Sequence, residues 1–215
     1  MTSHRLRSIV LLASAFLYGT VAHGDTIYNE SISGDLSNSG LTPTSVTVSL
    51  GSNDLFGTTG KNATTGTIDR DYFTFTVAQG MELTAITVLP GTQTLGTLGD
   101  SFIGMESGPE VTVSTAATTA AGLLGWDHYD TGDIGVNILP QMGTSCLGST
   151  GFTGPLPAGT YSFWVQEASV GTVPYGLEFT VATPEPASWT MLLTGMAALV
   201  GKTARRAARS RLFRA

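Results

Sequence analysis

The chain has 215 residues, and its 16 acidic residues outnumber its 10 basic ones, which gives a net charge of −6 at neutral pH. All 16 acids lie between Asp25 and Glu185, where only Lys61 and Arg70 are basic, so this stretch carries a net charge of −14. Such a surface repels nucleic-acid phosphates and anionic lipid headgroups, which excludes both as its partners. It is compatible with neutral or cationic glycans and with divalent cations, although an acidic surface also simply keeps a protein soluble.

The first 24 residues predict a secretory signal peptide. Arg5 and Arg7 supply the positive charge at its start, and Ile9–Leu17 form a short apolar core. The small residues in Ala22-His23-Gly24 suit a signal peptidase, so we expect cleavage after Gly24. Because the apolar stretch is brief, an uncleaved membrane anchor is the less favoured alternative.

Residues 25–182 predict one all-β domain. Apolar and polar residues alternate there, as in strands with one buried face, in segments 46–50, 72–77, 86–88, 161–165 and 177–181. Turn sequences such as residues 51–54 separate these segments, and the abundant Thr, Val and Gly argue against long helices. Residues 115–124 could form a helix, a loop or a strand. We expect about eight to ten short strands in two packed antiparallel sheets, an antiparallel β-sandwich.

Three segments between residues 69 and 181 resemble the bacterial pre-peptidase C-terminal domain. They are the opening segment 69–80, the segment 156–165 with its Ala158-Gly159-Thr160-Tyr161 turn and strand, and the closing strand 175–181. The resemblance implies a jelly-roll-like β-sandwich of the kind appended to secreted proteases. It also implies an architecture similar to carbohydrate-binding modules, in which some members bind calcium. Residues 92–155 are longer and richer in Gly and Thr than this pattern needs, so their strand order stays open.

Two groups of acidic residues are candidate calcium sites. Asp69 and Asp71 offer hard oxygen ligands one residue apart. The alternative is that they are turn carboxylates that accept hydrogen bonds from backbone amides, with Arg70 neutralising one of them. The second group has three-residue spacing and lacks the Gly and terminal Glu of an EF-hand loop: Asp127, Asp130 and Asp133. We expect no obligatory cofactor, with calcium as the one candidate.

Aromatic side chains offer a candidate glycan platform, since the C–H faces of sugars stack on flat rings. Trp164 is out of phase with the buried Phe163, so it should point away from the core, where a neighbouring loop could cover it. Trp126 and Tyr129 lie in or beside a predicted loop.

The sequence contains no motif of a common hydrolase or nucleotide-binding enzyme, because Gly-x-Ser-x-Gly, His-Glu-x-x-His and a phosphate loop are all missing. Cys146 is the single cysteine and forms no internal disulfide, and nothing local pairs it with His128. Four glutamates could in principle supply a glycosidase pair: Glu82, Glu110, Glu167 and Glu178. We expect no catalytic residues and a non-enzymatic protein, with a glycoside-active enzyme as the least favoured alternative.

Residues 183–215 predict a sorting signal with three parts. Pro184-Glu185-Pro186 should be extended, because each proline disfavours helix in the residue before it. The apolar run Ala187–Val200 is shorter than the roughly 20 residues that span a bilayer, but the aliphatic stems that follow it extend its effective length. We therefore expect a single C-terminal transmembrane helix rather than a buried or interfacial one. Its basic tail should stay cytoplasmic: Lys202, Arg205, Arg206, Arg209, Arg211 and Arg214.

Residues 184–214 resemble the PEP-CTERM sorting domain of Gram-negative bacteria, on the strength of Pro184-Glu185-Pro186, a short apolar segment with Trp189 near its start, and an Arg-rich end. The resemblance implies that exosortase processes the chain near the Pro-Glu-Pro motif. It also implies association with the cell envelope and with the exopolysaccharide of biofilms. We therefore expect export across the inner membrane, a transient membrane anchor, and a final place at the cell surface or outside the cell. The expected role is that of a non-catalytic surface or extracellular-matrix protein, and the alternative is a calcium-stabilised carbohydrate-binding module.

Overall fold

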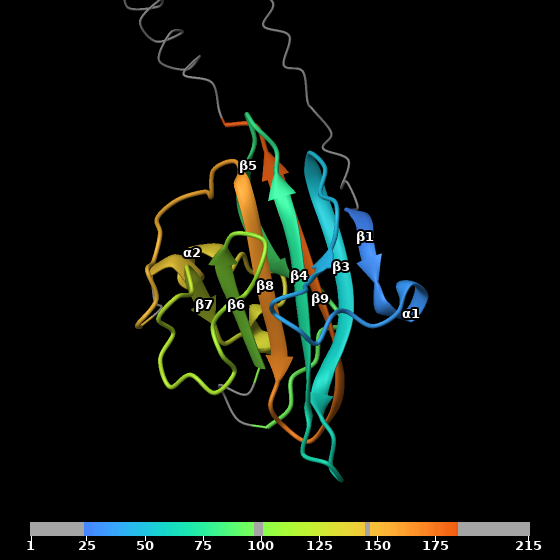
Figure 1. Ribbon diagram of the computed structural model, residues 1–215. Helices are drawn as coiled ribbons and strands as arrows, with labels where there is room; N and C mark the ends of the chain where they lie inside the picture. The colour runs from blue at the N-terminus through green and yellow to red at the C-terminus, as the bar shows by residue number, and fades with distance from the viewer. Residues whose placement is uncertain (1–23, 97–100, 145–146, 185–215) are drawn as a thin grey trace, which may run out of the picture.

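The computed structural model describes residues 24–96, 101–144 and 147–184, and β-strands dominate them (Figure 1). The strands are β1 (Asp25–Asn29), β2 (Thr44–Ser45), β3 (Gly51–Lys61), β4 (Ile68–Val77), β5 (Glu82–Val88), β6 (Ser101–Ser107), β7 (Gly125–Asp127), β8 (Gly159–Glu167) and β9 (Gly171–Ala182). The helices are short: α1 (Glu30–Ser33), the 3-10 helix η1 (Thr131–Asp133) and α2 (Leu139–Thr144). The all-β prediction is therefore confirmed.

The strands follow the order β5-β9-β3-β4-β8-β6-β7, and every neighbouring pair in this order is antiparallel. The short strands β1 and β2 add in parallel to β3 and β4. The link between β3 and β4 is narrow, because only the pairs Gly60–Asp69 and Lys61–Ile68 join them. By contrast, ten residue pairs join β3 to β9 and eight join β4 to β8. The order thus divides into two halves that meet at the β3–β4 hairpin.

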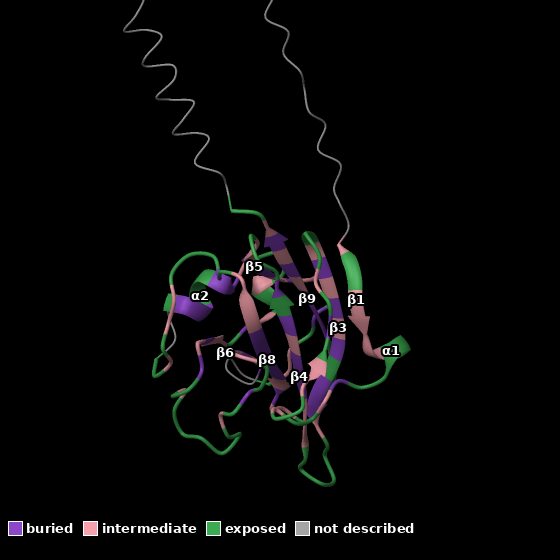
Figure 2. Cartoon of the chain, turned by 45° about the horizontal axis from the view of Figure 1, so that its top comes forward, coloured by how far each residue is buried: buried purple, intermediate pink, exposed green. Residues whose placement is uncertain are grey.

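Aromatic rings from the two halves meet in the core. The ring of Phe179 on β9 lies edge-on to Phe73, Phe75 and Phe163, with centroid distances of 5.7, 5.1 and 5.2 Å. Phe163 in turn stacks on Phe73 and Phe75 across the β4–β8 pair. Figure 2 shows buried residues concentrated along these strands, whereas α1 and the tip of the β3–β4 hairpin are exposed. Burial of this ring cluster therefore joins the two halves.

Four of the five segments with alternating hydrophobicity lie within strands, namely β4, β5, β8 and β9. The fifth differs, since β2 ends at Ser45 and the next strand begins at Gly51, inside the predicted turn 51–54. The side chain of Asn53 explains the shift. Its Oδ1 accepts from the Ser49 N–H at 2.7 Å and its Nδ2 donates to the Ser49 carbonyl at 2.9 Å, so the chain turns before β3 instead of within it.

Residues 115–124 form a loop without helix or strand. Leu123 from this loop, together with Val111, Tyr72 and Trp164, forms a second apolar cluster outside the aromatic core. Trp164 therefore points away from the main core as predicted. The loop covers its side chain, so that only 7% of the residue's surface is exposed. Within the described residues no helix is long and apolar enough to cross a membrane. The predicted signal peptide up to residue 23 and the predicted C-terminal helix 187–200 lie outside them.

Replacing Phe179 by Ala should destabilise the protein by about 3–5 kcal/mol, because the change empties the position that three other rings contact. Denaturant unfolding of the two proteins measures the difference. The control Leu41→Ala removes a side chain that is 61% exposed and should change stability by less than about 0.5 kcal/mol. A loss below about 1 kcal/mol for Phe179→Ala would show that this ring does not join the two halves.

Candidate functional site

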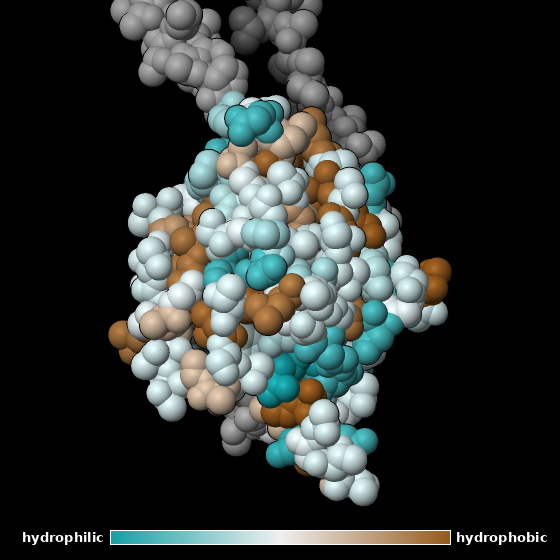
Figure 3. All heavy atoms as spheres, in the orientation of Figure 1, coloured by the Kyte–Doolittle hydropathy of each residue, from teal (hydrophilic) through white to brown (hydrophobic). Residues whose placement is uncertain are grey.

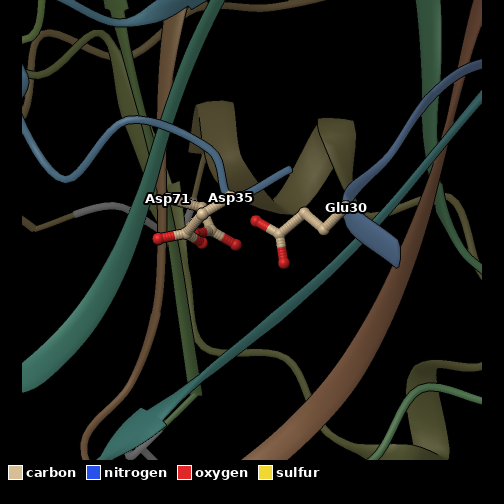
Figure 4. Close-up of side chains that lie close together, drawn as sticks. All are labelled: Glu30, Asp35 and Asp71. Carbon is tan, nitrogen blue, oxygen red and sulfur yellow. The ribbon is translucent and has the colours of Figure 1, made fainter. Parts of the chain in front are cut away.

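Two carboxylates from the segment after β1 and one from β4 converge in the structure (Figure 4). Each of Glu30, Asp35 and Asp71 offers a carboxylate oxygen, and these oxygens lie within 4.8 Å of one another. Among the residues that the structure describes, no other group of three His, Cys, Asp or Glu side chains converges in this way. We call these three residues the acidic cluster.

Asp71 is the buried member of the acidic cluster. On β4 it has the same strand parity as Phe73 and Phe75, so its side chain points to the interior between the two halves of the sheet. It is 0% exposed, and neither of its carboxylate oxygens has a hydrogen-bond partner among the described residues. A buried carboxylate without hydrogen bonds is costly, so this position demands a compensating group.

Glu30 and Asp35 reach Asp71 because the segment that follows β1 folds back over β3. The side chain of Asn29 accepts from the Ser31 N–H and caps α1, the single turn that starts at Glu30. The Glu30 carboxylate then accepts from the backbone N–H of Leu36 at 2.9 Å and from that of Thr58 on β3 at 2.7 Å. These bonds hold Glu30 in place, while Asp35 remains exposed to solvent.

The electrostatics of the acidic cluster favour a neutral or compensated Asp71. Burial raises the pKa of Asp71 to about 9, and the neighbouring charge of Glu30 adds to this rise. Burial also raises the pKa of Glu30, although its hydrogen bonds to Leu36 and Thr58 act in the opposite direction. Arg70 does not neutralise Asp71, since its guanidinium donates to the Gln166 side chain at 2.9 Å and to the Ile68 carbonyl at 3.3 Å.

Tyr175 on β9 completes the buried side of the acidic cluster. Its ring is buried, and its hydroxyl lies close enough to Asp71 to lower the pKa of that carboxyl. Neither group, however, makes a hydrogen bond of normal geometry within the described residues. The ring fits there because its cross-strand partner is Gly57, where a Cβ would lie 2.6 Å from the Tyr175 hydroxyl. Two buried polar groups thus face the same small space.

The other predicted calcium ligands lie elsewhere. Asp69 is on β4 but outside the acidic cluster. Asp130 caps η1, with its Oδ1 accepting from the Gly132 N–H, while Asp133 Oδ2 accepts from the Asp130 N–H at 2.9 Å. Asp127 accepts from the N–H of His128 at 2.9 Å. Asp127, Asp130 and Asp133 therefore accept hydrogen bonds from nearby backbone N–H groups.

A pocket of about 330 Å³ lies on the outer side of β6, β7 and β8. Four rings line it, from Phe102, Trp126, His128 and Trp164. Phe102 stacks on Trp126 at 6.1 Å and meets Trp164 edge-on at 5.0 Å, while Trp126 meets His128 edge-on at 5.2 Å. Residues of the loop 113–120 close its other side. We call this the aromatic pocket.

The aromatic pocket also carries polar groups. The indole N–H of Trp164 is not one of them, because it is fully buried; it has no hydrogen-bond partner among the described residues. Nδ1 of His128 lies 2.9 Å from the Ser101 carbonyl and must donate to it, so Nε2 is an acceptor in the neutral ring. Hydroxyls line the loop side, from Ser114, Thr118 and Thr119. The described lining contains no Asp, Glu, Lys or Arg.

The glutamates considered for a glycosidase pair include one with a clear local role. Glu167 is buried, and its carboxylate accepts from Ser101 Oγ at 2.6 Å and from the backbone N–H groups of Leu95 and Ser169. It therefore ties together the strand ends of β6 and β8. Cys146 and the predicted sorting residues from Glu185 onward lie outside the described residues.

Sequence reasoning included Asp71 among its candidates but missed Glu30 and Asp35. One signal was available for Asp71, since the alternation of Phe73, Phe75 and Val77 places a carboxylate on the buried face. No local pattern points to Glu30 or Asp35, because they reach Asp71 only through the way the segment after β1 folds over β3.

In buffer without divalent cations, the protein should lose stability as the pH rises from about 4 to about 9. Native Asp71 keeps its proton up to about pH 9, whereas the unfolded chain releases it near its ordinary pKa of 3.8, so deprotonation favours unfolding across this range. The groups that set this behaviour are Glu30, Asp69 and Asp35, whose charges raise the pKa, and Tyr175, which lowers it.

Urea unfolding at pH 5 and pH 8 in EDTA measures this effect, which should be on the order of several kcal/mol. Asp71→Asn is uncharged at both pH values, so its stability should differ far less between them. Equal pH dependence in the two proteins would contradict the assignment of this titration to Asp71.

Comparison of the chain with protein-family models, with curated proteins and with solved structures returned no match. Function is therefore inferred from the chemistry of the acidic cluster and the aromatic pocket.

Proposed function

We propose that this chain is an exported, non-catalytic module of the cell surface or extracellular matrix, and that it binds a neutral saccharide in the aromatic pocket. The observation that carries the proposal is the group of rings from Phe102, Trp126, His128 and Trp164 that line this pocket.

The chemistry of the aromatic pocket matches a sugar better than other small ligands. Flat rings offer faces for sugar C–H groups, and here Trp126 is partly buried while His128 is exposed. Hydroxyls and a histidine nitrogen at the edge can exchange hydrogen bonds with sugar hydroxyls. With no charged side chain in the described lining, an ionic ligand would lose hydration without gaining a counter-charge. Its volume of about 330 Å³ is at the lower end of the range of ligand pockets.

Binding is proposed rather than turnover because the described lining holds one titratable side chain, His128. Hydrolysis of a glycoside ordinarily takes a pair of carboxylates on opposite sides of the bond.

The finer fold assignment and the localisation belong to the same proposal. The narrow β3–β4 link and the ring contacts across the core support a jelly-roll-like β-sandwich. On the face in Figure 3, scattered hydrophobic residues lie among residues that are mostly of intermediate hydropathy. Such a surface suits a module exposed to water. The predicted signal peptide and the Pro184-Glu185-Pro186 signal support export, a transient anchor and release by exosortase.

Replacing Trp126 by Ala should weaken saccharide binding about tenfold, because the change removes a partly exposed indole ring that lines the aromatic pocket. Retention on immobilised dextran, cellulose and galactomannan identifies a bound polymer, and titration with its oligosaccharide gives the affinity. Trp126→Phe keeps a ring and should retain most of the affinity, and the distant Leu41→Ala should retain all of it. Failure of the wild-type protein to bind any neutral polymer, or unchanged affinity in Trp126→Ala, would contradict the proposed site.

The C-terminus should depend on exosortase. Intact-mass analysis of the protein from hosts with and without the enzyme should show a chain that ends near Pro184–Pro186 only when the enzyme is present. An Arg-rich tail that persists in both hosts would mean a retained anchor, and the proposed release would be wrong.

A further inference from the structure

The acidic cluster places three carboxylates within 4.8 Å of one another, with Asp71 fully buried among them. Like charges at this distance repel strongly in a medium of low dielectric constant, so something must compensate them. The compensating group is a proton, a basic side chain or a bound cation. The nearest basic side chain in sequence, Arg70, is engaged by Gln166 and Ile68.

We propose that Glu30, Asp35 and Asp71 bind a Ca²⁺ ion, and that this ion fastens the segment 30–37 to β4. The inference does not depend on the aromatic pocket, which lies on other elements and shares no residue with the acidic cluster.

The available ligand atoms suit calcium. Both oxygens of Asp71 lack hydrogen-bond partners among the described residues. Glu30 Oε1 accepts one hydrogen bond, from the Leu36 N–H, and so keeps a lone pair for a metal ion. Every ligand is a hard oxygen, with no nitrogen or sulfur of the kind that selects zinc. The exposed side of Asp35 leaves room for the waters that complete the six to eight ligands of calcium.

The position of the ion explains what it would do for the fold. Leu36, the residue after Asp35, is 1% exposed and belongs to the hydrophobic core. The next residue, Ser37, accepts a backbone hydrogen bond from the Tyr72 N–H at 2.8 Å, directly beside Asp71. An ion bound to all three carboxylates would therefore hold this segment closed over the end of the core. Its removal would leave the segment held by the hydrogen bonds that the Glu30 carboxylate accepts, by the Tyr72–Ser37 backbone bond and by the buried Leu36 side chain.

The competing account is that a proton alone compensates Asp71. The two accounts differ in their response to calcium, because a protonated cluster gains nothing from the ion. They also differ in the effect of Asp71→Asn, which mimics the protonated acid but is a poor ligand for a cation.

The test uses the full-length chain, purified in a mild detergent, stripped with EDTA and held at pH 7.5. Thermal unfolding is followed with 1 mM CaCl₂, with 1 mM MgCl₂, and with KCl at equal ionic strength. Calcium should raise Tm by about 5 °C, and magnesium and potassium by much less. Amide hydrogen exchange of residues 30–37 should slow on addition of calcium and recover with EDTA.

Asp71→Asn and the exposed Asp35→Asn should both abolish the calcium shift. Glu110→Gln removes the same charge from an exposed position outside the acidic cluster and should keep the shift. Equal Tm values in calcium and EDTA for the wild-type protein would overturn the proposal. So would a shift that persists in both variants, or an equal shift with KCl, which would show general screening of the acidic surface. Saccharide retention by Asp71→Asn should be unchanged, so failure of one proposal is separable from failure of the other.

Discussion

The carboxylate of Asp71 lies at the end of the row of buried side chains that Phe73, Phe75 and Val77 continue along β4. A charge there faces the interior between the two halves of the sheet, and the chain as described gives it no hydrogen bond. The arrangement of the neighbouring side chains reflects this buried carboxylate, which has no hydrogen bond within the described residues. The segment after β1 brings two further carboxylates to it, and β9 brings the Tyr175 hydroxyl. The charges of Glu30 and Asp35 oppose a charge on Asp71 unless a proton or a cation compensates them, whereas the Tyr175 hydroxyl favours the charged form.

Much of the fold could be predicted from alternation alone, because β4, β5, β8 and β9 each bury one face and show it in their sequences. Strand β3 could not be predicted in this way, since Gly51–Lys61 is rich in Gly and Thr and becomes a strand through its long pairing with β9. The acidic cluster was predictable only in part. The position of Asp71 two residues before Phe73 predicts that its side chain lies on the buried face of the strand. Glu30 and Asp35 join it only through the tertiary fold, and no local sequence pattern predicts their contact with Asp71.

The aromatic pocket could likewise be predicted from the sequence only in part. The out-of-phase position of Trp164 predicted that its ring would leave the main core. The position of Trp126 on β7 and of His128 just after it, next to Phe102 and the loop 113–120, depends on the β6–β7 pairing. The two sites divide the proposed work of the module: the cation would secure the N-terminal segment, and the pocket would hold the ligand.

The most direct test of the central claim is a crystal structure of the protein grown with calcium, with anomalous data that identify the ion. The account predicts an anomalous peak within about 2.3–2.6 Å of carboxylate oxygens of Asp71 and Glu30, with Asp35 completing the protein ligands. A map with no peak at the acidic cluster, and with Asp71 joined to Glu30 by a short hydrogen bond between their carboxyl groups, would contradict it. That result would mean that a shared proton, and no metal ion, compensates the buried charge.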